Sequence, residues 1–399
     1  MPDGESALVR HVEVLAAELA DARRVLYHNQ AREAAQRNAL ALGLMGALAA
    51  RSDAEAKART LAFAVFKCAA KIRRRPAPQV GFVESLLRRL GPPGQAMLIA
   101  GSGLWRWSGG GVRGRLHDLR RMAVYARRGA DSSLQPPALV DQAWYLSNLG
   151  TAQTGASALV HYLSQGAGEG LTPHPLFDPE YYLGQCAAAG MSVLGMTPLE
   201  HFIRQGAPRG LDPHPLFSIA WYVGQRPDVA SNGENPLQHY LDRGWAEGSS
   251  PHPLFDPDWY LSQAPMAAKA EPPLRHYLVH GWRDGLTPHP LFDGAWYLAQ
   301  YADVAHAGAE PLTHYVTIGG REGRNPSPWF DAGHYAAVRG DALVGGANPL
   351  VDYLTGGAWS VSEARPGFAT AAYIAARPEA AAAGRTPLEH WARRSVPPA

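Results

Sequence analysis

Histidine is the side chain in this sequence with the clearest capacity for chemistry, because imidazole binds metals and transfers protons near neutral pH. Of the 16 histidines, ten recur at two fixed positions of a repeated pattern, the PLxH-type and PHP segments. A metal site needs ligands that converge within about 2 Å of one ion, whereas equivalent residues of successive repeats are separated by the repeat spacing. We therefore expect structural roles and no bound metal for His161, His201, His239, His276, His314 and His390, and for His174, His214, His252 and His289.

Two aspartates form the one carboxylate pair with a known catalytic pattern. Asp256-Pro-Asp258 matches the D-x-D with which many glycosyltransferases hold a metal and a sugar nucleotide. The equivalent positions of other repeats do not keep the pair, so we interpret Asp256 as a helix N-cap. The sequence also has no GxxxxGK[ST], GxSxG or HExxH motif, and GSGLWRWSGGG lacks the glycine spacing of a dinucleotide fingerprint. We expect a protein that is not an enzyme and that uses no cofactor.

Tryptophan recurs at one further position of the repeat and is the candidate for ligand or partner binding. The indole ring there either packs against the next repeat or forms an exposed platform for sugar rings or a partner helix. Both interpretations remain open for Trp144, Trp221, Trp259 and Trp296.

Basic side chains are concentrated in the first third of the chain. Residues 1–140 hold 22 Lys and Arg against 11 Asp and Glu, whereas the remainder holds 15 against 24. Basic amphipathic helices favour the surface of an anionic membrane, and an acidic protein partner is the alternative. Nucleic acid is disfavoured because no recognisable binding fold accompanies the charge. The candidate contact residues are Lys71, Arg73, Arg74, Arg75, Arg120, Arg121, Arg127 and Arg128.

The elements that carry these residues are short helices in tandem repeats. Six phenylalanines recur at intervals of 37 to 40 residues, and each is followed five residues later by tyrosine. In each repeat an Asp or Ser cap begins one helix, and a cap followed by proline, as in Asn235-Pro236, begins a second. We expect the glycines at 166, 206, 244, 281, 319 and 357 to end the second helix in a left-handed turn.

Helices of two to three turns are marginal alone, so they must gain stability from their neighbours. The sequence therefore predicts an all-α protein in which residues 141–399 form about seven two-helix repeats, stacked as a solenoid or superhelical array. Residues 1–75 are predicted to be an N-terminal helical module, a short coiled coil or a helical hairpin. Residues 76–140 are predicted to be a basic linker with one amphipathic helix over about 112–128.

The pattern FDPxWYLxxxPDVAxxGxxPLxHYLxxGxxEGxxPHPLF resembles a repeat of bacterial surface-polysaccharide proteins, where it lies beside glycosyltransferase or rhamnan-synthesis domains. Ser218–Phe255 and Asp293–Phe330 approach it closely. The resemblance implies a scaffold or adaptor for protein–protein interaction in polysaccharide biosynthesis, with a glycosyltransferase or glycan-export component as partner. A lectin-like array that binds glycan is the rival hypothesis, and a divergent glycosyltransferase subunit is a third. Because no secretory signal or membrane-spanning run is visible, we expect a cytoplasmic protein. If the basic residues bind an anionic membrane, the protein is expected to be peripheral at the inner membrane.

Overall fold

The computed structural model describes residues 91–395, apart from positions 93, 106–110, 129–138, 150–156, 194, 265–269, 341–342, 344–346, 362 and 383. The predicted N-terminal helical module, residues 1–75, lies outside the described residues, as do Lys71, Arg73, Arg74 and Arg75. The described residues are helical and contain no β-strand, only isolated bridges such as His252 with Phe255. The predicted all-α class is therefore confirmed for these residues.

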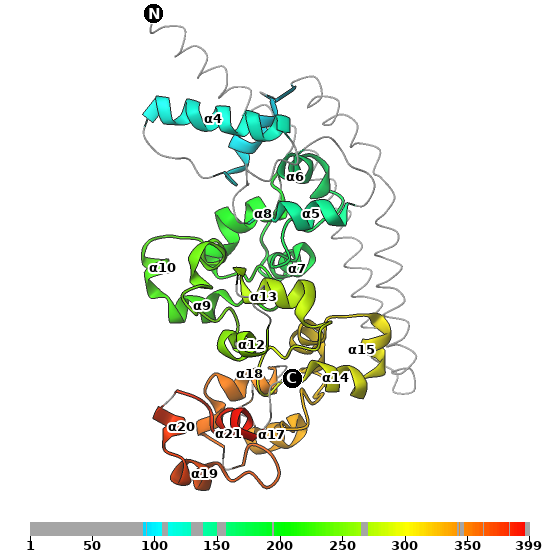
Figure 1. Ribbon diagram of the computed structural model, residues 1–399, viewed down its shortest axis with the longest axis vertical. Coiled ribbons are helices and arrows are strands. Elements are labelled where there is room, and N and C mark those ends of the chain that lie inside the picture. Colours follow the sequence, from blue (N-terminus) through cyan, green and yellow to red (C-terminus); the bar gives the residue numbers. More distant parts are fainter. Residues whose placement is uncertain are drawn as a thin grey trace, which may run out of the picture. The chain divides into compact units, whose positions relative to one another are not determined.

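The chain divides into two compact units, Met1–Leu211 and Asp212–Ala399. In Figure 1 the first unit runs from cyan to green and holds the following elements. They are α4 (Gly111–Arg128), α5 (Gln142–Asn148), α6 (Ala158–His161), η2 (Tyr162–Gly166), α7 (Pro179–Ala188), α8 (Pro198–His201), η3 (Phe202–Gly206) and η4 (Ala207–Arg209).

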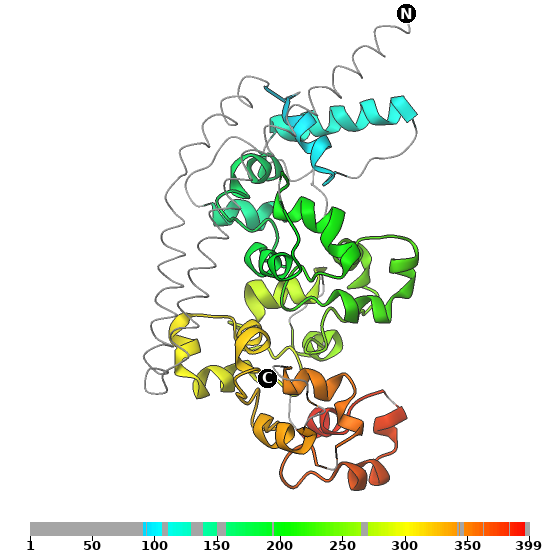
Figure 2. The ribbon, with the colours of Figure 1, turned by 180° about the vertical axis from the view of Figure 1, so that it is seen from behind.

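The second unit continues with the same alternation of short helices, which can be followed from the other side in Figure 2. Its elements are α9 (Ile219–Gln225), α10 (Pro227–Ser231), α11 (Pro236–His239), η5 (Tyr240–Gly244), α12 (Pro257–Gln263), α13 (Pro273–His276), η7 (Tyr277–Gly281), α14 (Gly294–Gln300), α15 (Ala302–Ala307), α16 (Pro311–His314), η8 (Tyr315–Gly319), α17 (Ala332–Arg339), α18 (Pro349–Leu354), η10 (Gly357–Trp359), α19 (Thr370–Ala376), α20 (Glu379–Ala382) and α21 (Pro387–Ser395).

Six copies of the repeat begin their first helix with a side-chain cap, as the sequence predicts, whereas α19 of the last copy follows Ala369, which provides no such cap. A side-chain oxygen accepts a backbone N–H of the first turn at Asp141, Asp178, Ser218, Asp256, Asp293 and Asp331. The second helix is capped in the same way by Asn235 and Asn348, and Thr197 with Glu200 forms a full capping box. These caps satisfy amide groups that the helices themselves leave without partners.

The second helix of most copies widens from an α-helix into one π-helical turn, which the sequence analysis did not predict. In the second unit α11 passes into η5, α13 into η7 and α16 into η8. Each of these π turns ends at one of the recurrent glycines.

The expectation that these glycines adopt left-handed conformations is wrong. Gly206 has φ −68°, and the left-handed glycines lie four residues later, at Gly170, Gly210, Gly248, Gly285 and Gly323. Glycine is required at the earlier position for space. A Cβ on Gly319 would lie 2.0 Å from the hydroxyl oxygen of Tyr297, and the glycines of the other copies meet a tyrosine in the same way.

The core of each copy that begins with a phenylalanine is a cluster of three aromatic rings. In the copy that begins at Phe217, the ring centroids of Phe217 and Tyr222 lie 5.4 Å apart, and Tyr240 packs edge-on against both. All three side chains are completely buried. The predicted contact between each phenylalanine and the tyrosine five residues later is therefore present, and the second helix adds a further ring.

A backbone hydrogen bond joins the two ends of several copies. The N–H of the residue after the phenylalanine donates to a proline carbonyl near the end of the same copy, from Ser218 to Pro251 at 2.9 Å, from Asp256 to Pro288 at 2.9 Å and from Asp293 to Pro326 at 3.1 Å. In the first unit Asp141 donates to Pro173 at 3.0 Å. Side-chain bonds join consecutive copies of the second unit: the hydroxyl of Tyr277 donates to the Glu310 carboxylate at 2.6 Å, and the amide of Asn348 donates to the carbonyl of Tyr315 at 3.3 Å.

Helix α4 lies in the segment that the sequence predicts to be a basic linker. It packs on the first copy in the way that the second helix of one copy packs on the next copy. The hydroxyl of Tyr125 accepts the N–H of Leu159 at 3.2 Å. The hydroxyl of Tyr353 accepts the N–H of Leu388 in the same way at 3.0 Å. Repeat-like packing therefore begins before residue 141.

Candidate binding sites

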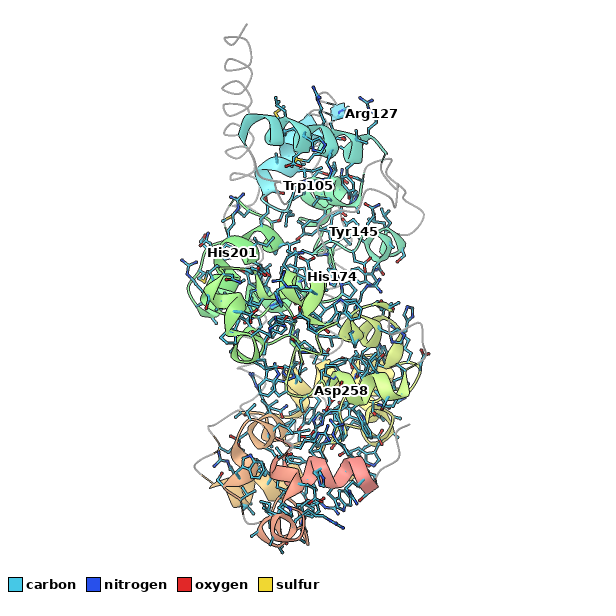
Figure 3. All side chains as sticks on the ribbon, turned by 60° about the vertical axis from the view of Figure 1, so that its left-hand side comes forward. Trp105, Arg127, Tyr145, His174, His201 and Asp258 are labelled. Atoms are coloured by element: carbon cyan, nitrogen blue, oxygen red, sulfur yellow. The ribbon has the colours of Figure 1, made fainter. Side chains whose placement is uncertain are left out.

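A buried tyrosine–histidine pair connects the two helices of nearly every copy. The tyrosine hydroxyl lies 2.5 to 3.0 Å from the histidine Nδ1 in Tyr145–His161, Tyr182–His201, Tyr222–His239, Tyr260–His276, Tyr297–His314 and Tyr373–His390. Figure 3 labels Tyr145 and His201, which belong to different pairs of the first unit. Burial raises the tyrosine pKa well above its usual range and lowers the pKa of His201, His239 and His276.

Both partners of such a pair are therefore neutral, and the bond between them holds the helices together. In the pair Tyr222–His239 the proton positions follow from a third residue. The Nε of Arg243 donates to His239 Nε2 at 3.0 Å, so Nδ1 carries the ring proton and donates to the tyrosine oxygen. Histidine at this position works as a structural hydrogen-bonding group.

The histidines of the PHP segments close a tight turn. In each case Nδ1 accepts the backbone N–H two residues later, as from Leu254 to His252 at 3.1 Å and from Leu291 to His289 at 3.1 Å. Burial lowers the pKa of His214, His252 and His289 to about 3. No group of three or more potential metal ligands comes together among the residues that the structure describes.

The aspartates of the D-x-D pattern are used separately. Asp256 caps α12 by accepting the N–H of Trp259 at 2.9 Å, and it also forms an ion pair with Arg393 of α21. Asp258 is exposed on the first turn of α12, where Figure 3 labels it. The interpretation of Asp256 as a cap is confirmed.

The tryptophan row divides into one buried ring and three half-buried rings. Trp259 is 7% exposed, and the guanidinium of Arg393 lies 5.7 Å from the centre of its ring. Trp144, Trp221 and Trp296 are half-buried. A continuous exposed platform along all four rings is therefore not formed, whereas each of the three half-buried rings keeps part of its surface accessible.

A glutamine four residues after the tryptophan fixes this part of two copies, and the sequence analysis missed it. The amide of Gln225 both donates to and accepts from the backbone of Ser250, and Gln263 does the same with Thr287. The indole N–H groups of Trp221 and Trp259 donate to the hydroxyls of these same two residues at 3.2 and 2.8 Å. The recurrence of glutamine at 185, 225, 263 and 300 was the available signal.

The basic face of α4 is exposed, but its apolar face is not. Arg120, Arg121 and Arg127 are exposed, and Figure 3 shows Arg127 at an edge of the first unit. Met122 and Tyr125 on the other side of the helix are buried within that unit. The side chain of Arg128 lies outside the described residues. A contact of α4 with an anionic surface would thus rely on its arginines, without insertion of the apolar face.

None of the helices in the described part of the chain is both long and apolar enough to cross a membrane. No protein-family model matches the chain, and no match was found among curated proteins or solved structures.

Proposed function

We propose that the copies within each unit stack as a solenoid, and that the array is a non-catalytic scaffold or adaptor that binds another protein. The observation that carries this proposal is the use of the recurrent polar side chains. Tyrosine, histidine and the capping aspartates are engaged in the same internal bonds in copy after copy. Bonds between consecutive copies, such as that from the Tyr277 hydroxyl to the Glu310 carboxylate, support the stacking.

One exposed position of the array precedes each of the left-handed glycines Gly170, Gly210, Gly248, Gly285 and Gly323, and its residue is acidic in four of these five copies. An exposed side chain that recurs on a constant framework would offer a partner the same kind of contact from copy to copy. The residues at this position are Glu169, Arg209, Glu247, Asp284 and Glu322.

We further propose that the partner is a glycosyltransferase or a component of glycan export, and that the complex works in bacterial surface-polysaccharide synthesis at the cytoplasmic face of the membrane. The support is the resemblance of the repeat. The exposed arginines Arg120, Arg121 and Arg127 would then contact acidic lipid or an acidic protein surface.

In vivo photo-cross-linking tests the scaffold function. A photoreactive amino acid is placed at Glu169 or Asp284, which are exposed in turns of the first and second unit. The control position is Leu312, which is completely buried. We expect a discrete adduct with one other protein from the exposed positions and none from the control, and mass spectrometry then identifies the partner.

Two results would contradict the proposal. One is the lack of any protein adduct from both exposed positions. The other is turnover of sugar nucleotides by the purified chain, which would favour a glycosyltransferase subunit.

A further inference from the structure

A hollow of about 240 Å³ lies beside Trp144 in the first copy of the repeat. Its lining combines the apolar side chains of Trp144, Leu149 and Leu171 with the polar side chains of Asn148 and Thr172. None of its lining residues is charged. The hollow belongs entirely to the first unit, in which α5 supplies the tryptophan and the asparagine.

In two copies of the second unit a glutamine bridges the same place. There Gln263 crosses from its helix to the following turn, where its amide nitrogen donates to the carbonyl of Thr287 at 3.0 Å. Gln225 reaches Ser250 in the same way at 2.9 Å. The first copy has Asn148 at this position, and asparagine is one methylene shorter. Its amide donates to the carbonyl of Trp144 within its own helix at 2.8 Å.

The shorter side chain leaves several polar groups available to a ligand. The indole N–H of Trp144 and the hydroxyl of Thr172 have no hydrogen-bond partner within the described part of the chain, although their counterparts Trp259 and Thr287 bond to each other. The carbonyl oxygen of the Asn148 amide is likewise without a partner there. One N–H donor, one amide acceptor and one hydroxyl thus surround a half-buried aromatic ring.

The chemistry of the hollow selects the class of ligand. Pockets for drug-sized molecules have volumes of roughly 300–1,000 Å³, so this hollow holds a single ring. The absence of charged residues from its lining disfavours phosphates and nucleotides, since a buried anion needs a charged or strongly donating partner. A molecule with one apolar face and a rim of hydroxyls would pack on the indole and bond with its edge.

We propose that the hollow beside Trp144 binds one neutral sugar ring of a glycan. The ring stacks on the indole, and its hydroxyls bond to the indole N–H, the Asn148 amide and the Thr172 hydroxyl. The site goes beyond the scaffold function, because it uses one copy of the repeat and none of the exposed turn positions that precede the left-handed glycines.

Titration of the full-length chain with defined sugars tests the proposal. The probes are neutral trisaccharides of glucose, galactose, mannose and xylose, each raised to about 10 mM, ten times a Kd of 1 mM. Binding is followed by tryptophan fluorescence and isothermal titration calorimetry. We expect at least one trisaccharide to saturate the wild-type chain at a single site.

The deciding variant is Asn148→Gln, which introduces the residue that bridges this place in two copies of the second unit. We expect it to fold normally and to weaken sugar binding by about tenfold or more, whereas Gln238→Asn in the second unit, which shortens a glutamine bonded to Asp242, leaves this binding unchanged. Trp144→Phe removes the N–H donor and should also weaken binding. Circular dichroism verifies that each variant is folded.

The proposal is overturned if none of the four trisaccharides binds. It is also overturned if a sugar binds wild type and Asn148→Gln equally well. Neither result would affect the cross-linking expected from Glu169 and Asp284, so failure of the sugar site and failure of the scaffold function are distinguishable.

Discussion

Replacement of Gly319 by alanine should destabilise the protein through a single oxygen atom. The added Cβ would lie 2.0 Å from the hydroxyl oxygen of Tyr297, and real Cβ contacts are not shorter than 3.0 Å. One of the two groups must therefore move by at least 1 Å. Tyr297 has little freedom to move, because it is completely buried and its ring packs against Phe292 and Tyr315.

The expected cost has two parts. Overpacking of a well-packed core costs about 1–3 kcal/mol. Displacement of the tyrosine also breaks its 3.0 Å bond to His314 and strands a buried hydroxyl, which adds about 1–3 kcal/mol. We expect Gly319→Ala to lower the free energy of unfolding by about 3 kcal/mol, measured as a shift of the urea midpoint by circular dichroism.

The tyrosine hydroxyl can be removed to test the cause. With Tyr297→Phe in place, the nearest remaining atoms to the new Cβ are a ring carbon at 3.3 Å and the flexible side chain of Arg324 at 3.4 Å. Alanine is favoured over glycine inside a helix by about 0.5–1 kcal/mol. We therefore expect Gly319→Ala to be nearly neutral or slightly stabilising when it is combined with Tyr297→Phe.

Gly323, four residues later in the same copy, is the matched control. It has φ +71° and open space around its Cα, so alanine there should cost about 1–2 kcal/mol in both backgrounds. The explanation is refuted if Gly319→Ala costs the same with and without the Tyr297 hydroxyl, or if it costs less than Gly323→Ala.

Three further predictions follow from the buried polar groups and the basic face. His214, His252 and His289 stay neutral in the fold, where their pKa is about 3, but protonate below about 6.5 when unfolded. The stability that these neutral histidines contribute is therefore fully present above about pH 6.5 and is lost toward about pH 3. The free energy of unfolding should fall by up to about 4 kcal/mol per pH unit in this range. His252→Ser should make this fall less steep, as measured by urea titrations at several pH values. Tyr260→Ala should cost about 3–5 kcal/mol in denaturation, and Tyr260→Phe only about 1–2, because phenylalanine loses just the bond to the histidine. The full-length chain should sediment with anionic vesicles at low salt and be released near about 0.5 M salt, and charge reversal at Arg120, Arg121 and Arg127 should abolish sedimentation.

The helix starts and the aromatic contacts could be predicted from the sequence because both depend on residues close together in the chain. An aspartate caps the turn that immediately follows it, and Phe255 meets Tyr260 across a single cap. The predicted second helices also begin at their cap–proline pairs, as at Asn235-Pro236. Local rules were sufficient for these features.

The role of the glycines could not be predicted in this way, because the constraint on them comes from another helix. Gly244 at the end of η5 has to admit the hydroxyl of Tyr222, which belongs to α9. A helix-ending glycine and a glycine needed for space have the same appearance in a sequence. The left-handed position at Gly248 was present four residues later.

The start of the repeat-like packing was predictable but was obscured by charge. Tyr125 precedes Val140 by 15 residues, the same interval as between Tyr240 and Phe255, and in both cases a leucine stands just before the second residue. The arginines around Tyr125 favoured a separate basic helix. Its hydroxyl instead accepts the N–H of Leu159 in the first copy, so the charge lies on the outer face of a helix that packs like part of a repeat.

Where one copy departs from the pattern, a second change usually restores the lost bond. Asp352 replaces the paired histidine and accepts the hydroxyl of Tyr335 at 2.5 Å, while Arg339 neutralises its charge from 2.7 Å. Ser327 replaces the turn histidine and still accepts a backbone N–H, at 3.3 Å. Asn148 departs without such a replacement, because no described residue takes over the bonds that glutamine makes elsewhere. The last two copies also lack the glutamine, with Val338 and Ala376 in its place, but they lack the tryptophan as well. Asn148 stands beside a retained tryptophan, and internal stability does not account for it. The ligand site is therefore assigned to this copy.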